Sequence, residues 1–441
     1  MTNRPSFAKS QAFTRRLERV VPGGAHTYSK GRDQFPQESP SGIVRGEGAR
    51  VWDIDGNRLI DWGMSLASVS IGHGHPEIVG AVCRAIQGGV NFSRPAALEL
   101  EAAERFVRFS GDDMVKFARH GSCVNSAAVK LARAFTGRAK VAVAAEHPFF
   151  SFDDWFIVST PTDFGIPEEI GKFTVKFRYN DIDSLRRLFE TDGDDIACVM
   201  LEPVKFEPPR DGFLEAVRAL CTERGAVLVF DEMQSGLKFP LPGAGRHFGV
   251  AADLTTWGKG IGNGFSISAL SGRAEIMQLG GIDHEGQRKL FLISTTHGAE
   301  LVGLSALIAT LDFFERGDVV GANWATGRRL RERLEAVFRR HGLSDHLSIV
   351  GYDGHLSLVI LGPKKVPDDS FRTLLMQELI AGGVLFQGTF VMTPSHGQAE
   401  IDETADTFDA ACGVFARALS AGTTDGLLIG PATRPVFRRF V

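Results

Sequence analysis

Short apolar runs alternate with stretches of helical periodicity through the middle of the chain, from about residue 75 to residue 310. The helical stretches include 97–109 and 126–135. The apolar runs have the length of buried strands and are VAVAA at 141–145, IACVML at 196–201, AVLVFDE at 226–232 and SISALSG at 266–272. Such alternation is typical of a mostly parallel sheet covered by helices on both faces. The pattern therefore predicts an α/β fold for this part.

The two ends of the chain follow a different pattern. In residues 43–62, alternating apolar positions flank Asp55-Gly56, which predicts two strands joined by a hairpin turn. The later elements are expected to be helices at 302–316 and 326–339, a strand within 355–362 and a helix near 402–419. Because chain ends often meet in space, they are expected to form one smaller α+β domain. The predicted bounds are 1–66 for the N-terminal segment, 67–315 for the large domain and 316–441 for the C-terminal small domain.

The bulk composition narrows the classes of protein. The 441 residues exceed one ordinary core, and 43% hydrophobic with 23% charged residues is typical of a folded globular chain. A formal net charge of −4 gives no broad cationic surface for nucleic acid. No apolar run reaches the roughly 20 residues of a membrane span, and the first residues lack the apolar segment of a secretory signal. Five scattered cysteines without a CxxC argue against disulfides or structural zinc, so a cytoplasmic enzyme is expected.

Two charged residues follow apolar runs, at the strand ends where open parallel sheets bind ligands. Asp231 lies at the end of a predicted buried strand, where a carboxylate needs a partner. A helix N-cap or a structural ion pair would satisfy it equally well. Lys259 lies in WGKGIGNG, which is neither a P-loop nor a G-x-G-x-x-G motif. It is either an incidental lysine of a flexible loop or a nucleophile of the Schiff-base type.

Three further segments carry polar or aromatic residues beside predicted strands or helices. Residues 121–125, Gly-Ser-Cys-Val-Asn, open a helix and predict an anion site, although N-capping by Ser122 or Asn125 would explain the same residues. The hydroxyls of residues 294–298 could serve the same anion or cap the next helix. In residues 147–150, His-Pro-Phe-Phe, an aromatic ring could stack on a planar ligand or pack in the core. Together with a lysine and an acid, these groups match what pyridoxal phosphate (PLP) requires.

The sequence resembles the class III, fold type I PLP-dependent aminotransferases, especially the glutamate-1-semialdehyde aminomutase branch. The likeness covers nearly the whole chain and keeps its order. Its elements are VPGG at 21–24, GEGARVWDIDGNRLIDW at 46–62, IGHGHP at 71–76, GSCVNSAAVKLARAFTGR at 121–138, LEPV at 201–204, FDEMQSG at 230–236 and WGKGIGNGF at 257–265. The resemblance implies a large PLP-binding domain with a mostly parallel sheet, a small domain formed by both termini, and a homodimer.

The resemblance also implies residue roles. Lys259 would form the internal aldimine and then act as the base, which requires a lowered pKa from burial and nearby positive charge. Asp231 would hold the ring nitrogen protonated. The other implied cofactor contacts are Gly121 and Ser122 at the phosphate, Thr296 reaching the phosphate of the neighbouring subunit, Phe149 stacking on the ring, Gln234 near the ring hydroxyl, and Glu202 lining the site.

The departures from the aminomutase pattern concentrate on the substrate side. They are Cys123 for a glutamate, Phe149-Phe150 for a Tyr-His pair, Gln234 for a methionine, Leu66 for a tryptophan, and Thr27-Tyr28-Ser29-Lys30 for a Ser-Pro-Val-Arg segment. Tyr28, Lys30 and the nearby Arg32 are therefore candidate substrate residues. Because the chain has 33 Phe but only 3 Tyr, Tyr28 is a rare phenol. These changes favour a substrate other than glutamate semialdehyde.

The leading hypothesis is an aminotransferase that moves an amino group between an amino donor and a keto or aldehyde acceptor. An intramolecular aminomutase of the glutamate-1-semialdehyde type is the alternative, because it uses the same groups and differs in retaining its intermediate. A hydrolase with a metal on His73, His75, His147 and Asp231 is a further alternative. A non-catalytic relative retained for binding would not need Lys259 and Asp231.

Overall fold

The computed structural model describes residues 4–283 and 288–436. By its internal contacts the chain divides into two compact units. The central unit comprises Ala67–Ser70 and Pro76–Val320, and the terminal unit comprises Met1–Leu66, Ile71–His75 and Gly321–Val441. Whether the predicted domains 1–66, 67–315 and 316–441 fold as such stays a prediction.

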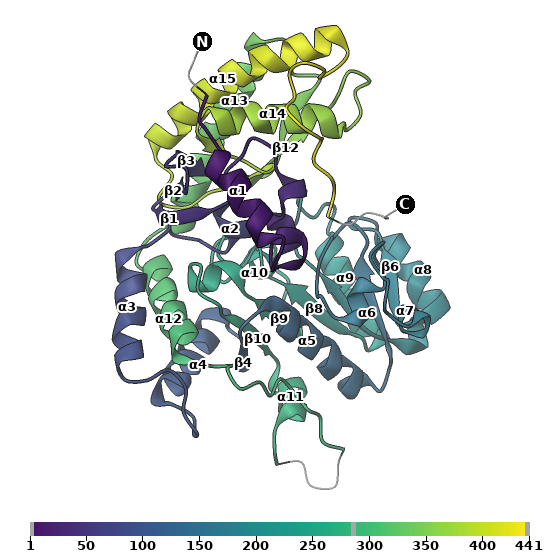
Figure 1. Ribbon diagram of the computed structural model, residues 1–441. Helices are drawn as coiled ribbons and strands as arrows, with labels where there is room; N and C mark the ends of the chain where they lie inside the picture. Colours follow the sequence, from purple (N-terminus) through teal and green to yellow (C-terminus); the bar gives the residue numbers. More distant parts are fainter. Residues whose placement is uncertain (1–3, 284–287, 437–441) are drawn as a thin grey trace. The chain divides into compact units, whose positions relative to one another are not determined.

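A seven-stranded sheet forms the centre of the central unit, in the order β4-β10-β9-β8-β7-β5-β6 (Figure 1). Its strands are β4 (Met114–Ala118), β5 (Lys140–Ala144), β6 (Thr174–Phe177), β7 (Ile196–Leu201), β8 (Val227–Asp231), β9 (Leu254–Trp257) and β10 (Ser268–Gly272). The pairs along β9-β8-β7-β5-β6 are parallel, whereas β10 runs antiparallel to both β4 and β9. The predicted mostly parallel sheet is confirmed, with β10 as the reversed strand.

Helices cover both faces of this sheet because its strands alternate side chains between two cores. Val141 and Val143 pack in one core with residues of α5, while Ala142 and Ala144 pack in the other with residues of α8 and α9. The helices of eight or more residues within this unit are α3 (Pro76–Gln87), α4 (Ala97–Ser110), α5 (Gly121–Thr136), α8 (Ile182–Asp192), α9 (Phe213–Arg224) and α12 (Leu301–Glu315). Short helical turns complete it at α6 (Asp154–Ile157), α7 (Glu168–Gly171), α10 (Ala244–His247) and α11 (Ala274–Met277). Helix α12 packs against α3 and α4.

Segments from both chain ends share one sheet of the terminal unit, in the order β1-β2-β3-β13. These strands are β1 (Ile43–Glu47), β2 (Arg50–Asp53), β3 (Arg58–Asp61) and β13 (Val384–Leu385). The predicted hairpin around Asp55-Gly56 joins β2 to β3 and is confirmed. The prediction of two strands over 43–62 was wrong, because Gly48 adopts a φ of +58° and separates β1 from β2.

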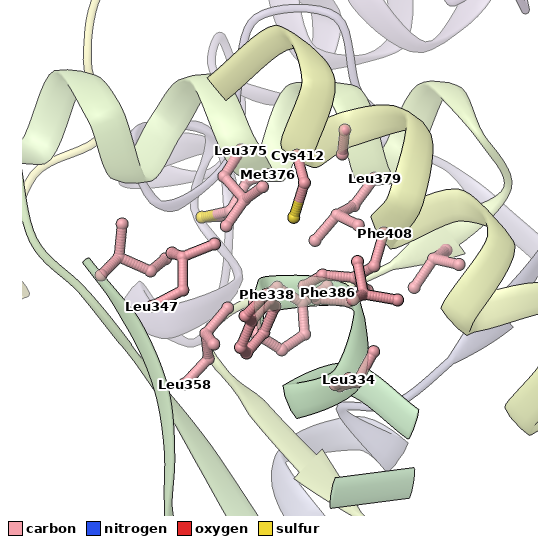
Figure 2. Packing of buried hydrophobic residues seen from close by; sticks show 14 of the residues in the cluster. Leu334, Phe338, Leu347, Leu358, Leu375, Met376, Leu379, Phe386, Phe408 and Cys412 are labelled. Carbon is pink, nitrogen blue, oxygen red and sulfur yellow. The ribbon is translucent and has the colours of Figure 1, made fainter. Parts of the chain in front are cut away.

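The remainder of the terminal unit packs helices over a second, antiparallel sheet. That sheet contains β11 (Leu347–Tyr352), β12 (His355–Ile360) and β14 (Thr389–Val391). The helices are α14 (Asp369–Ala381), α15 (Gln398–Ala421) and α13 (Val319–Arg340), whose first two residues belong to the central unit. Figure 2 shows the core between them, where Phe338, Phe386 and Phe408 gather beneath Leu375 and Leu379. Helix α1 (Ala8–Leu17) instead contacts the β2–β3 turn, where the Lys9 and Ser10 backbone N–H groups donate to the Asp55 carboxylate at 2.8 Å. Among the described residues, no helix has the length and apolar character of a membrane span.

Candidate active site

Asp231 is a buried carboxylate held by two donors. It is the last residue of β8 and only 3% exposed. The Met233 backbone N–H donates to its Oδ1 at 2.9 Å, and the Asn125 Nδ2 donates to its Oδ2 at 2.9 Å. Burial, followed by the neighbouring Glu202, raises the pKa of Asp231 to about 6, while Lys259 and these two donors oppose the rise. No helix begins here, so the N-cap interpretation is wrong.

Lys259 opens a tight turn directly after β9. Its φ is +48°, and it starts the short 3-10 segment Lys259–Gly262. The preceding Gly258 leaves no room for a side chain, since a Cβ there would lie 2.5 Å from the Met233 Sδ and 2.8 Å from the Ser268 Oγ. Ser70 fixes the turn by donating its Oγ–H to the Gly260 oxygen at 2.6 Å. The loop is therefore tightly packed, not the flexible surface loop that was one alternative.

Met233 shows that three segments meet at one place. Its Sδ would lie 3.0 Å from a Cβ on Gly121 and 2.5 Å from a Cβ on Gly258. Its backbone N–H binds Asp231. The first residue of α5, the end of β8 and the Lys259 turn thus converge around one side chain. Their roles at a cofactor stay a prediction.

The first turn of α5 leaves backbone N–H groups without a side-chain cap. The helix follows an extended His120, and no side chain within the described residues caps it. The Ser122 Oγ instead accepts the Phe152 backbone N–H at 3.1 Å. N-capping by Ser122 or Asn125 was therefore a wrong interpretation. Free N–H groups and the helix dipole make this end favourable for an anion.

Phe149 and Phe150 occupy different environments. Phe150 is 1% exposed and packs in the core beside α5, whereas Phe149 is 46% exposed. The ring of Phe149 meets the edge of Phe156, with centroids 6.1 Å apart. The Phe150 oxygen accepts the Asn125 Nδ2 at 2.6 Å, so this aromatic segment is joined to the residue that binds Asp231. Of the two rings, Phe149 keeps a surface for a planar ligand.

Glu202 follows β7 and is paired with a lysine that the sequence analysis did not single out. The Lys205 Nζ donates to both Glu202 carboxylate oxygens, at 2.7 and 3.0 Å. The Glu202 backbone N–H donates to the His147 Nδ1 at 3.0 Å. Burial opposes ionisation of Glu202, but Lys205, His147 and Lys259 outweigh it and lower the pKa of this carboxyl. Glu202 is therefore a buried carboxylate of the same charge cluster.

The electrostatics of Lys259 agree with the predicted direction. Burial lowers the pKa of its amine, and the positive charge of Lys205 lowers it further, whereas Asp231 and Glu202 act in the opposite direction.

Lys238 is, after Lys205, the second lysine of this region that the sequence did not identify as a site residue. Its Nζ donates to the Gln234 Oε1 at 3.1 Å, and burial followed by Lys259 and Lys205 holds its pKa well below the ordinary value.

A sequence signal existed for these missed residues, although it was not used. Lys205 stands three residues after Glu202, Lys238 stands four residues after Gln234, and Asn125 lies in the helix opening already under consideration. Each spacing permits a contact, but only the fold decides whether that contact is buried.

The remaining predicted residues are exposed or belong to the terminal unit. Thr296 is exposed, and its backbone oxygen accepts the Asn91 Nδ2 at 2.9 Å. In the terminal unit, Tyr28 is 75% exposed, the Lys30 Nζ donates to the Ser65 Oγ at 3.2 Å, and Arg32 forms an ion pair with Glu18.

Comparison with known proteins decides the family. A family model described as "Aminotransferase class-III" matches residues 34–359 of the 441. The chain belongs to the class-III aminotransferases. The predicted family is confirmed, while the predicted aminomutase branch is one of several groups with similar structures.

Solved structures resemble this class-III aminotransferase over most of its length. The PLP internal aldimine form of the FumI protein from Sphingopyxis sp. MTA144 matches with a TM-score of 0.84 and 28% identity, over 94% of this chain and 98% of that chain. A β-phenylalanine aminotransferase from Variovorax paradoxus matches with 0.78 and 28%, over 92% and 94%. A glutamate-1-semialdehyde aminomutase from Pseudomonas aeruginosa PAO1 matches with 0.80 and 20%, over 92% and 94%, and at that identity shows the fold alone.

The metal alternative gains no support from the geometry of this class-III aminotransferase. Across residues 4–283 and 288–436, no group of three or more His, Cys, Asp or Glu side chains is arranged to hold a metal ion. His73 instead lies 2.9 Å from the Asp61 carboxylate, measured from Nε2 to Oδ2.

The raised pKa of Asp231 predicts a pH-dependent stability of the ligand-free protein. An unfolded Asp loses its proton near pH 4, but the folded Asp231 keeps its proton up to about pH 6. The free energy of unfolding should therefore fall as pH rises between these values. Asp231→Asn should lack this component, so relative to the wild type it should gain up to about 3 kcal/mol between pH 4 and pH 7.5.

Urea unfolding of both proteins at the two pH values measures this difference. The similarly buried Glu232 is present in both chains, and its pKa is raised to about 7 mainly by burial and only in small part by Asp231, so most of its contribution cancels. Parallel stability curves for the two proteins would contradict the assigned environment of Asp231.

Proposed function

We propose that this chain is a PLP-dependent aminotransferase that moves an amino group between an amino donor and a keto or aldehyde acceptor. The observation that carries the proposal is the convergence of Lys259, Asp231 and the uncapped start of α5 around Met233. A lysine amine, a buried carboxylate and an anion site at one sheet edge form the donor set that PLP needs. Membership of the class-III family supports the same activity.

The residues present fit the cofactor. Gly121 and Ser122 would hold the phosphate at the start of α5, and the tight approach of Gly121 to Met233 excludes a side chain from this cradle. Phe149 would cover one face of the ring with its exposed surface. Asp231 would accept a hydrogen bond from the ring nitrogen, and Gln234 and Glu202 would line the remaining edge. When bound, PLP supplies an electron sink and carries the amino group between the two half-reactions.

The chain's own residues would then move the proton. A lowered pKa gives Lys259 a population of neutral amine, which a nucleophile or base requires. Its Nζ would take the proton from the substrate α-carbon and pass it to the cofactor. Asp231, whose ionised form is favoured by Lys259 and by its two donors, would stabilise positive charge on the ring nitrogen throughout.

Tyr28, Lys30 and Arg32 remain the proposed substrate residues. They differ from the aminomutase pattern, and Arg32 already has an acidic partner in Glu18. The structural neighbours with 28% identity include a protein described as an aminotransferase, whereas the aminomutase likeness at 20% supports the fold alone. These observations favour an aminotransferase over an intramolecular aminomutase. The cytoplasm remains the proposed compartment, in keeping with the five free cysteines.

Lys259→Ala should abolish turnover by removing the amine, while the fold and noncovalent PLP binding persist. Borohydride treatment followed by peptide mass spectrometry should attach the cofactor to Lys259 in the wild type and to no residue in the variant. Lys365→Ala, which removes an exposed lysine paired with Asp345, is the control and should behave as the wild type. Labelling of another lysine in the wild type would overturn the assignment.

A screen of amino donors separates the two reaction types. The PLP form is mixed with single amines or amino acids, and its absorbance is followed as it converts to the pyridoxamine form. An aminotransferase should accumulate that form with a donor and return to the first spectrum only after a keto or aldehyde acceptor is added. Complete isomerisation of one substrate with no second substrate would favour the aminomutase.

We also propose a homodimer in which Thr296 reaches the phosphate of the neighbouring subunit. Asn91 holds the Thr296 backbone, and exposed apolar side chains lie near Asn91 in the sequence, at Val90, Phe92 and Leu100. An exposed hydroxyl beside exposed apolar residues is suited to an interface with a polar contact to a ligand.

Mixed subunits test this arrangement. Thr296→Ala should weaken PLP binding about tenfold, the worth of one hydrogen bond to a charged group. Mixing it with Lys259→Ala should create mixed dimers in which one site has both residues intact, so some tight PLP binding and activity should return. Sedimentation should show a dimer for every variant. No recovery in demonstrably mixed dimers would place Thr296 at the site of its own subunit.

A further inference from the structure

Asn125 is a buried amide that connects parts of the proposed site. It is the fifth residue of α5 and 1% exposed. Its Nδ2 donates to the Asp231 Oδ2 at 2.9 Å and to the Phe150 oxygen at 2.6 Å. One side chain thus links the helix that opens at Gly121, the acid at the end of β8 and the segment that carries Phe149.

The orientation of this amide is fixed by its surroundings. Both Nδ2 hydrogens point to acceptors, so the reversed amide would place the Asn125 Oδ1 against the Asp231 carboxylate and the Phe150 carbonyl. In the adopted orientation the Oδ1 is buried, with no hydrogen-bond partner among the described residues. An unsatisfied buried acceptor costs stability, and asparagine is a weak helix former. Helix packing alone therefore gives no reason for this residue.

The two donors to Asp231 act on different oxygens. Met233 binds Oδ1 and Asn125 binds Oδ2, so together they fix the plane of the carboxylate. Hydrogen bonds to a carboxylate also favour its ionised form, and here they oppose burial and the charge of Glu202. The Met233 donor is backbone, so Asn125 is the side-chain component of this arrangement that substitution can remove.

We propose that Asn125 is a positioning residue, whose amide holds the Asp231 carboxylate ionised and directed at the ring nitrogen of the bound cofactor. This inference rests on the proposed PLP-dependent function. A purely structural role, in which Asn125 only fastens the Phe150 segment to α5, is the competing explanation. The two differ in whether loss of the amide affects the ring nitrogen specifically.

A pair of cofactors measures that specificity directly. The full-length protein, stripped of cofactor, is titrated with PLP and with its analogue in which carbon replaces the ring nitrogen. The wild type should bind PLP more tightly, because Asp231 pairs only with the nitrogen. Asn125→Leu should reduce this preference by about tenfold, the scale of a hydrogen bond to a charged group. Loosening of the fold would weaken the binding of both cofactors equally and leave the ratio of their affinities unchanged.

Two further variants keep the test decisive. Ser126→Ala removes hydrogen bonds to Ser151, Asp153 and Trp155 from the next residue of α5, none of which involves Asp231, and should keep the wild-type ratio. If Asn125→Leu does not fold, Asn125→Asp provides a nearly equal volume. At neutral pH its added carboxylate would repel Asp231, so the preference should again fall.

The outcomes separate the two proposals. An unchanged ratio in a folded Asn125 variant overturns the positioning role and leaves the proposed function intact. An equal reduction in Ser126→Ala overturns it as well, because any disturbance of the helix opening would then suffice. Failure of the wild type to bind either cofactor contradicts the proposed function itself.

Discussion

Buried charge at the carboxyl ends of β7 and β8 is the constraint on which the arrangement of the central unit depends. Two carboxylates, Glu202 and Asp231, are almost fully removed from water, and each would be costly alone. Glu202 is compensated by a lysine that contacts both of its oxygens. Asp231 is compensated by one backbone and one amide N–H. Burial and the charge of Lys205 lower the pKa of Lys259, which makes this residue suited to act as a neutral amine, and burial with Lys259 and Lys205 lowers that of Lys238.

The sheet explains why these groups meet. Strands β7, β8 and β9 are neighbours and run parallel, so their carboxyl ends lie along one edge. Glu202 follows the first, Asp231 ends the second, and Lys259 comes two residues after the third. Because the strands are buried on both faces, a charged ligand has to bind at this edge and not on a face of the sheet. Gly121 and Gly258, which both contact the Met233 side chain, then let the start of α5 approach the lysine turn.

Sequence patterns predicted the parts of this site that depend on local order. The apolar runs located the strands, so the sequence alone places Asp231 and Lys259 at their ends. The antiparallel direction of β10 was not predictable, because an apolar run does not indicate whether its strand is parallel or antiparallel to its neighbours. Helix α5 begins at Gly121, whereas the predicted helical stretch began at 126. The first residues of the helix are small and lack apolar periodicity, so the pattern did not include them. Lys205, Lys238 and Asn125 were missed because their importance comes from partners that only the tertiary fold supplies.

The hydrogen bond between Asn125 and the Phe150 backbone explains how phenylalanines can stand at positions 149 and 150. By resemblance, Phe149 and Phe150 stand where related enzymes have a Tyr-His pair, and the loss of both polar side chains would leave this segment without a hydrogen-bonding role. The structure supplies that role from the backbone, because the Phe150 oxygen binds the Asn125 amide while the Phe150 ring fills the core. A histidine buried there would need its own partners, whereas phenylalanine needs none. The Asn125 amide then carries the polar connection to Asp231, and the segment keeps an aromatic surface in Phe149 without burying a further titratable group.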